Sequence, residues 1–279
     1  MTTVTEPQYD VAVVGDNTID RYLDDPDLGD LVGGNALNVA VQLAMLGVRV
    51  RYFGAVGDDR DGEVVLNAMR RRALDTGGVR VMPGSTALTT IRRNDQGDRY
   101  FESEDFGVTA AYTPTPEEVR QISAASWVHI GMLPDAGVLR AALSALPANA
   151  RPVVSQDCSV SDGLDGLTVA FASAGESDEA ADELLARAMG AGALVAVATL
   201  GSRGAALRTS EGDHRVPSAP TQVVDTTGAG DSFMAGFIAA SVAGATPREA
   251  VEAGTRRGAF TCRFVGGWPQ LPADIETFG

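Results

Sequence analysis

Short apolar runs alternate with amphipathic segments along most of this 279-residue chain. The apolar runs, several of them rich in Val and Ala, occupy 9–16, 48–56, 127–132, 152–157, 168–173 and 193–200. Between them, apolar residues recur at helical spacing in 33–47, 61–74, 135–146 and 176–190. A strand that is apolar on both faces needs cover on both faces. The pattern therefore predicts an α/β fold, with a mostly parallel central sheet and helices on both of its faces.

One stretch interrupts this alternation. Two strand-like runs, 87–93 and 99–104, are joined by a segment whose Asn, Asp and Gly favour a hairpin turn. We expect 17–32 and 85–108 to form a small β-lid on a single domain that spans residues 1–279. The last third predicts an antiparallel edge pair at 204–210 and 213–220, then helices at about 230–243 and 247–264.

The charge of the chain excludes several classes of protein. A formal net charge of −15 argues against nucleic acid as the main partner, because phosphate backbones attract basic surfaces. ATP is not excluded, since a few oriented backbone N–H groups can hold it. Every basic residue is Arg. Without Lys the chain cannot perform Schiff-base chemistry, and it lacks the Lys of a Walker phosphate loop or of a protein kinase.

The remaining composition predicts a cytoplasmic protein with no membrane partner. Cys158 and Cys262 are too few for a disulfide framework, and His129 and His214 do not have zinc-site spacing. The N-terminus has no basic start and no apolar run, so no signal peptide is expected. No stretch approaches the ~18 apolar residues of a membrane helix.

The stretch 223–238 combines the features of a phosphate site. A strand-like start leads into Gly228, Ala229 and Gly230, and a helix follows at once. Small residues leave backbone N–H groups open to a ligand, and the start of a helix favours an anion. Asp231, in the first turn, is placed to accept the proton of a substrate hydroxyl during transfer of a γ-phosphate. The alternative is that Asp231 is only an N-cap residue.

Two patterns give the chain a family resemblance. The string DTTGAGDSFMAGF at 225–237 resembles the C-terminal signature of the ribokinase-like, or PfkB, family of sugar and nucleoside kinases. GGNALNVA at 33–40, followed by Gly47 and Gly57, resembles its N-terminal signature. The resemblance covers nearly the whole chain. It implies a large α/β domain with a β-lid, ATP as the phosphoryl donor and Mg²⁺ as a cofactor.

The resemblance also implies roles for individual residues. Asp231 resembles the catalytic base, and the amides of Gly228, Ala229 and Gly230 resemble the anion hole. The positions that resemble sugar ligands are Asp16, Gly33, Gly34, Asn35 and Asn38. Those that resemble nucleotide-binding positions are Thr199, Gly201, Gly204 and Thr227. An ordinary strand exit is the alternative for the turn at 199–204.

The expected metal positions depart from the family pattern at one place. The family often carries Asn-x-x-Glu near the metal and the phosphates, and here the stretch is Ser173-Ala-Gly-Glu176. Glu176 keeps the carboxylate, so we expect it to act on Mg²⁺ through water, while the role of Ser173 stays open. Asp225 and Thr227 resemble positions that hold a monovalent cation, such as K⁺, in some members. A structural hydrogen bond would explain these two residues equally well.

Shorter strings resemble the fructoselysine, or fructosamine, 6-kinase branch of the family. They are 15–17 with Asp20, 33–41, 56–59, 171–174 and 266–268. This resemblance implies transfer of the γ-phosphate of ATP to a primary hydroxyl of a ketose or an amine-conjugated ketose. The carboxylates that could pair with a cationic amine are Asp20, Asp24, Asp25, Glu102, Glu104 and Asp105. The alternative is a solvated acidic face, since exposed ion pairs contribute only ~0–1 kcal/mol.

The sequence leaves three alternative functions open and predicts a homodimer. Another kinase of the family would act on fructose, ribose, a 2-keto-3-deoxy acid or a nucleoside. A sugar- or nucleotide-binding protein would need no base, so Asp231 argues against it. A nicotinamide dehydrogenase needs Gly-x-Gly-x-x-Gly after the first strand, where this chain has Gly15-Asp-Asn-Thr-Ile-Asp. The apolar run 87–91 and the exposed edges of a lid hairpin predict a homodimer through the lids.

Overall fold

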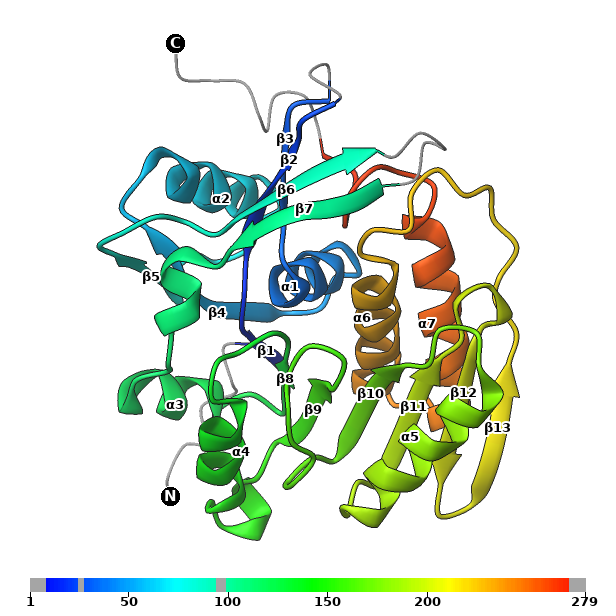
Figure 1. Cartoon of the computed structure of the whole chain (residues 1–279). Helices are drawn as coiled ribbons and strands as arrows, with labels where there is room; N and C mark the ends of the chain where they lie inside the picture. Colours follow the sequence, from blue (N-terminus) through cyan, green and yellow to red (C-terminus); the bar gives the residue numbers. More distant parts are fainter. Residues whose placement is uncertain (1–8, 25–27, 94–98, 271–279) are drawn as a thin grey trace.

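A nine-stranded sheet forms the body of the protein in the computed structural model, which describes residues 9–24, 28–93 and 99–270 (Figure 1). The strand order is β13-β12-β11-β10-β9-β8-β1-β4-β5. The strands are β1 (Val11–Val14), β4 (Val50–Gly57), β5 (Val79–Met82), β8 (Trp127–Ile130), β9 (Val153–Asp157), β10 (Val169–Ser173), β11 (Val195–Thr199), β12 (Ala205–Thr209) and β13 (Gly212–Val216). Neighbours from β5 to β11 run parallel, and β12 and β13 are antiparallel. The predicted mostly parallel sheet is confirmed.

Helices cover both faces of this sheet. They are α1 (Asn35–Met45), α2 (Arg60–Arg71), α3 (Pro116–Ile122), α4 (Ala136–Ser144), α5 (Asp178–Gly190), α6 (Ala229–Val242) and α7 (Pro247–Thr261), with short 3₁₀ turns at Gly107–Ala111, Ala148–Ala150 and Gly201–Arg203. Strand β1 shows the two-sided burial: Val11 and Val13 pack in the apolar cluster of α1 and α6, and Val14 packs in that of α4 and α5. Among the described helices, none has the length and apolar character needed to cross a membrane.

A four-stranded sheet, called the lid sheet below, stands beside the body (Figure 1). Its order is β3-β2-β6-β7, with strands β2 (Thr18–Tyr22), β3 (Asp30–Gly33), β6 (Leu88–Arg93) and β7 (Arg99–Asp105). The acidic segment after Asp16, which the sequence predicts as part of the β-lid, supplies β2 and β3, because Ile19 and Leu31 have apolar neighbours to pack against. The predicted hairpin turn at 94–98 lies outside the described residues.

The expected pairing of 87–91 with a second copy is wrong. Strand β6, which holds most of this run, is an inner strand that pairs with β2 on one side and β7 on the other. The outer strands are β3 and β7. On β3, the backbone of Val32 exchanges two hydrogen bonds with the Gln270 side chain, at 2.9 and 2.7 Å. An edge-to-edge contact through the lid sheet would therefore use β7.

Two short elements escaped the sequence prediction, β5 and α3. Helix α3 has local signals: Thr115 and Glu118 form a capping box, and Pro116 occupies the first turn. Strand β5 has only four residues, and it is held by parallel pairing with β4.

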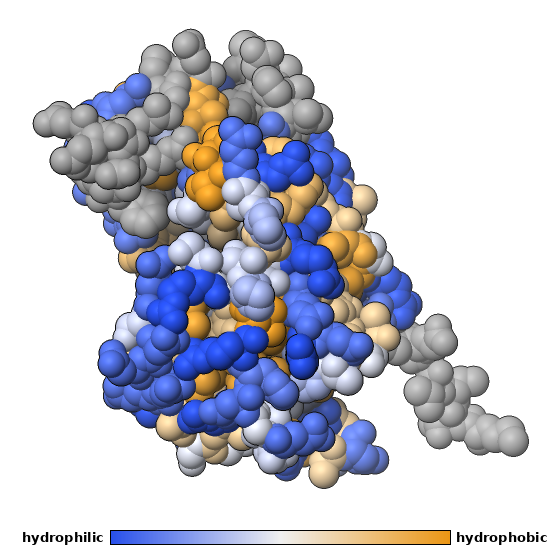
Figure 2. All heavy atoms as spheres, turned by 90° about the vertical axis from the view of Figure 1, so that its right-hand side faces the viewer, coloured by the Kyte–Doolittle hydropathy of each residue, from blue (hydrophilic) through white to orange (hydrophobic). Residues whose placement is uncertain are grey.

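The surface at the right of Figure 1 is seen face-on in Figure 2, where hydrophilic side chains gather in the lower part.

Candidate active site

A cavity of about 850 Å³ lies between the lid sheet and the start of α6. This volume is in the range of small-molecule sites. The cavity brings together many of the predicted site residues: Asp16, Gly34, Asn35, Asn38, Asp225, Thr227, Gly228 and Asp231. Sequence reasoning did not single out Thr18, Thr89, Phe106, Met132, Val223 or Val224, which also line it. Thr18 lies two residues before Asp20, so in a strand both side chains point to the same face. This spacing could have predicted that Thr18 lines the cavity.

Asp231 is held at the wall of this cavity by two helices. It is in the first turn of α6, whose N-cap residue is Gly228 with a φ of 71°. Its Oδ2 accepts a hydrogen bond of 2.7 Å from the side-chain amide of Asn38 on α1. Asp231 is therefore not the N-cap residue. A Cβ on Gly228 would lie 2.5 Å from the Cα of Gly267, so only glycine fits at this helix start.

The environment of Asp231 suits a proton acceptor. Its side chain is buried, with 7% exposure. Burial raises the pKa of Asp231 well above its usual value, the hydrogen bond from Asn38 lowers it, and nearby carboxylates such as Asp157 raise it again. A carboxylate whose pKa is moved toward neutrality is a better general base than one in water.

The amides at the start of α6 are not equivalent. The N–H of Ala229 donates to the carbonyl of Thr226 at 3.1 Å. Among the described residues, the N–H groups of Gly228 and Gly230 have no such acceptor. A Cβ built on Gly230 would meet nothing within 4 Å, so the space in front of this residue is open. Of the three amides expected in the anion hole, those of Gly228 and Gly230 are available to an anion.

Asp16 joins the first strand to α1. Its carboxylate accepts hydrogen bonds from the backbone N–H groups of Asn35 and Ala36, at 2.8 and 2.9 Å, and from the Asn35 side chain at 3.2 Å. Burial raises the pKa of Asp16, and these donors lower it. Asp16 thus fixes the start of α1, and with it the position of Asn38. Gly33 does not line the cavity, because it lies behind the Asp20 carboxylate.

Asp225 makes hydrogen bonds within the loop before α6 and to the segment after α7. One oxygen accepts from the backbone and the hydroxyl of Thr227, at 3.1 and 2.9 Å, and the other accepts from the N–H of Gly266 at 2.9 Å. These contacts connect the loop before α6 to the segment after α7. They match the structural alternative for Asp225 and Thr227, and the monovalent-cation role stays a prediction.

The predicted nucleotide turn and Glu176 lie next to each other, away from the lining of the cavity. Thr199 ends β11 beside Ser173, the last residue of the neighbouring β10. In the turn that follows, Ser202 donates to Glu176 Oε1 at 2.5 Å, and Arg203 donates to the Glu176 carbonyl at 2.7 Å. The two loops are thereby joined at the carboxyl ends of adjacent parallel strands, where α/β proteins place ligands.

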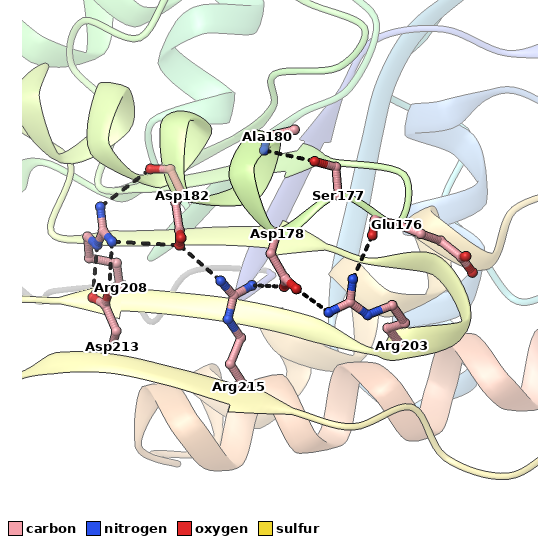
Figure 3. A network of polar contacts seen from close by, with 9 residues as sticks. All are labelled: Glu176, Ser177, Asp178, Ala180, Asp182, Arg203, Arg208, Asp213 and Arg215. Atoms are coloured by element: carbon pink, nitrogen blue, oxygen red, sulfur yellow. Dashed lines mark hydrogen bonds and ion pairs between the residues drawn. The ribbon is translucent and has the colours of Figure 1, made fainter.

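A ladder of ion pairs continues from this junction along α5, β12 and β13 (Figure 3). Arg203 pairs with Asp178, which also pairs with Arg215 at 3.1 Å. Arg215 reaches Asp182 at 2.9 Å, and Arg208 binds Asp213 at 2.6 Å. Each pair is partly exposed, so its own contribution to stability is small, but the ladder fixes the orientation of Arg203.

Gly204 has a structural role in the same turn. Its φ is 98°, and a Cβ would lie 2.1 Å from the carbonyl oxygen of Val216. Glycine is therefore required for β12 to leave the turn against β13. The nucleotide-binding role of Thr199, Gly201 and Gly204 stays a prediction.

The six carboxylates considered for a cationic amine divide into groups. Asp24 and Glu102 both pair with Arg92, at 2.8 and 2.6 Å. Asp25 lies outside the described residues. The remaining three, Asp20, Glu104 and Asp105, line the cavity. The acidic character of this part of the chain is therefore partly neutralised at the surface and partly directed into the cavity.

A preformed metal cage is absent from the described part of the chain, which has no group of three or more His, Cys, Asp or Glu side chains placed for a metal. Mg²⁺ at kinase sites is held by one or two carboxylates together with substrate phosphates and water. The Glu176 carboxylate, held by Ser202 beside the nucleotide turn, fits such a role.

Comparison with known proteins agrees with this geometry. The family model described as "pfkB family carbohydrate kinase" matches residues 9–273. A fructoselysine 6-kinase of Shigella flexneri is 32% identical over 92% of this chain and 99% of its own length. A fructosamine kinase of Bacillus subtilis is 31% identical over 91% of this chain and 90% of its own length. An ATP-dependent ribose-1-phosphate kinase of Halopiger xanaduensis is 32% identical over 87% and 84%, respectively.

Solved structures show the same fold. The ribokinase of Arabidopsis thaliana, solved with ribose and ATP, superposes with a TM-score of 0.80 at 21% identity, over 92% of this chain and 94% of that one. The ribokinase of Thermotoga maritima gives a TM-score of 0.78 at 18% identity, over 96% of each chain. With a family model matched over nearly the whole chain and two signatures converging on one cavity, this protein belongs to the pfkB family of carbohydrate kinases and is an ATP-dependent sugar kinase with the ribokinase-like fold.

Proposed function

We propose that this kinase transfers the γ-phosphate of ATP to a primary hydroxyl of a ketose or an amine-conjugated ketose, as a fructosamine 6-kinase would. The observation that carries the proposal is the position of Asp231. Its buried carboxylate lines a cavity large enough for a sugar conjugate, within one turn of the open amides of Gly228 and Gly230.

The proposed chemistry needs one base and one anion hole. The acceptor oxygen attacks the γ-phosphorus, the bond from that phosphorus to the β–γ bridging oxygen breaks, and ADP leaves. Asp231 takes the hydroxyl proton on Oδ1, because Oδ2 is occupied by Asn38. The amides of Gly228 and Gly230 stabilise the negative charge on the transferred group.

The other site residues bind and orient. Asp16 is hydrogen-bonded to Asn35 at the start of α1, and Asn38 on the same helix is hydrogen-bonded to Asp231, so these residues present polar atoms of defined position to the sugar. The turn 199–204 is proposed to hold the nucleotide. Glu176, beside the nucleotide turn, would hold Mg²⁺ through water, and the cation would neutralise phosphate charge, which matters because the described lining of the cavity has no basic side chain.

Two observations favour an amine-conjugated ketose over a plain sugar. Relatives above 30% identity are named for fructoselysine and fructosamine. The cavity is lined by carboxylates rather than by cations. Another relative is named for ribose 1-phosphate, so the experiment that tests the proposal must include other acceptors.

A coupled assay of ADP release over a panel of acceptors tests the proposal. The panel contains fructoselysine, fructose, ribose, a 2-keto-3-deoxy acid and a nucleoside, each with ATP and Mg²⁺. We expect the highest kcat/KM with fructoselysine. Equal kcat/KM for fructoselysine and fructose would remove the case for amine recognition, and ATP consumption without any phosphorylated acceptor would overturn the kinase assignment to these sugars.

A further inference from the structure

One face of the lid sheet carries a row of polar side chains into the cavity. Asp20 on β2 is opposite Thr89 on β6, and Thr89 is opposite Glu104 on β7. Residues in register across neighbouring strands point to the same face of a sheet, and these three all line the cavity. The spacing between strands puts the backbones of Asp20 and Glu104 about 10 Å apart, so a group bound over Thr89 would lie between the two side chains.

The carboxylate of Asp20 is unusual among the buried acids of the site. Its side chain is only 7% exposed, and no hydrogen bond or ion pair joins its oxygens to another group in the described chain. By contrast, Asp16 accepts three hydrogen bonds, and Asp231 accepts one from Asn38. A buried carboxylate without a partner is costly, so its position indicates a ligand that supplies the missing donor.

The acidic lining of the cavity predicts that this ligand carries a positive charge. Six of the described residues that line it are acidic, namely Asp16, Asp20, Glu104, Asp105, Asp225 and Asp231, and none is Arg or His. The pKa of Asp20 is raised to about 7, mainly by burial. Repulsion from the carboxylates of Asp16 and Asp225 also raises it. Glu104 acts in the same direction. Repulsion of this kind is relieved by a bound cation.

The acids at the outer surface of the lid sheet are not part of this row. Arg92 binds Asp24 and Glu102, and thereby neutralises two exposed carboxylates outside the cavity. Asp105 faces the cavity but accepts a hydrogen bond from the N–H of Gly107 at 2.9 Å, which ties it to the turn after β7. Of the three carboxylates by which the described part of the lid sheet lines the cavity, Asp20 and Glu104 are therefore the two without a hydrogen bond or ion pair.

We infer that Asp20 and Glu104 form a binding site for a protonated amine carried by the sugar acceptor, with the hydroxyls of Thr18 and Thr89 as additional acceptors. This inference rests on the proposed function, because it concerns the part of the same acceptor that does not react. Thr18 and Thr89 lie 3.1 Å apart, oxygen to oxygen, at the base of the row.

The chemistry of the row favours an ammonium group over a metal ion. Mg²⁺ and Ca²⁺ take six or more oxygen ligands at short, fixed distances. The row offers two carboxylates on strands separated by a third, and the described residues hold no cluster of three metal-binding side chains. An ammonium with two or three N–H donors on a flexible stem can reach both carboxylates and a hydroxyl.

A matched pair of acceptors isolates the charge. One is a 1-deoxy-1-alkylamino-fructose, whose secondary amine is protonated at neutral pH. The other is the 1-O-alkyl fructose, in which an ether oxygen replaces the amine. For the wild-type protein we expect kcat/KM for the amine to exceed that for the ether by about 10- to 100-fold, the range for a charge-assisted hydrogen bond.

Three variants then assign this preference to residues. Glu104→Gln and Asp20→Asn should each reduce the preference at least several-fold, mainly through KM of the amine. Glu102→Gln is the control, because it removes a carboxylate from the same strand outside the cavity and leaves Arg92 paired with Asp24. Its preference should be that of the wild type. Should Asp20→Asn fold poorly, the exposed Glu104 carries the test alone.

The outcomes separate this inference from the proposed function. Calorimetric binding of the two acceptors without nucleotide measures the same preference when there is no turnover. A wild-type protein that phosphorylates both acceptors equally, or Glu104→Gln and Asp20→Asn variants that lose activity toward both equally, would overturn the amine site while leaving the kinase intact. Preferential binding of the amine without phosphorylation of either acceptor would instead overturn the proposed function.

Discussion

Replacement of Asp231 by Asn is the sharpest test of the site. The variant keeps the shape of the side chain and retains an oxygen for the hydrogen bond from Asn38, which is 2.7 Å long in the structure. It removes the only group that we assign as proton acceptor. A positioned general base contributes ~10²–10⁴-fold to a rate. We therefore expect kcat to fall by that factor, equivalent to about 2.7–5.4 kcal/mol at ~1.36 kcal/mol per decade.

The same variant should not lose stability. Burial holds the pKa of Asp231 above that of the unfolded chain, so the folded protein binds the proton more tightly. Stability from this group is complete below the unfolded pKa and is lost as the pH rises through the folded one. Asn does not titrate. The Tm of Asp231→Asn should therefore equal or exceed that of the wild type at pH 8, and its relative advantage should shrink as the pH falls toward 4.

Two measurements on one preparation decide the matter: ADP release at saturating substrates and thermal unfolding at pH 5 and pH 8. Asp157→Asn is a matched control, since Asp157 is also a buried carboxylate near Asp231 but does not line the cavity. Its kcat should change by less than about tenfold. Near-normal turnover by Asp231→Asn would refute the assignment of the base, and a lower Tm at pH 8 would refute the account of its burial.

Four further predictions follow from the geometry. Arg203→Met should raise KM for ATP several-fold without changing KM for the sugar, because the substitution releases the nucleotide turn from the Glu176 loop. The control is Arg208→Met at the far end of the ladder, which should leave both KM values unchanged. Gly230→Ala should lower kcat/KM for ATP at an unchanged Tm, since its Cβ would enter open space, while Gly228→Ala should lower Tm, since its Cβ would meet Gly267. For the amine acceptor, KM should fall as the pH rises through about 7, where the Asp20 carboxylate ionises, and the ether acceptor should lack this dependence. Light scattering at micromolar concentration should give the mass of a dimer, and a strictly monomeric mass would remove the lid-to-lid assembly.

Much of the fold was readable from the chain because its signals are local. The parallel strands are short apolar runs, and α6 and α7 begin close to where glycine and proline predict. The elements that were missed or misassigned depend on distant partners. Strand β2 was expected only as an unspecified part of the β-lid, and its bounds are set because Ile19 and Tyr22 face apolar neighbours from other segments. Strand β6 was expected at an edge, but pairing with β2 makes it an inner strand.

The sequence by itself determined the family, the proposed phosphate-binding helix start and the identity of the proposed base, because each lies within one continuous string of residues. Tertiary structure decided how these groups are used. Asn38 reaches Asp231 across 193 positions because α1 packs on α6. It also decided which acids are available, since Arg92 neutralises two of them at the surface while Asp20 and Glu104 face the cavity. Charge is a property of residue type, but its pairing and its desolvation depend on neighbours that only folding brings together.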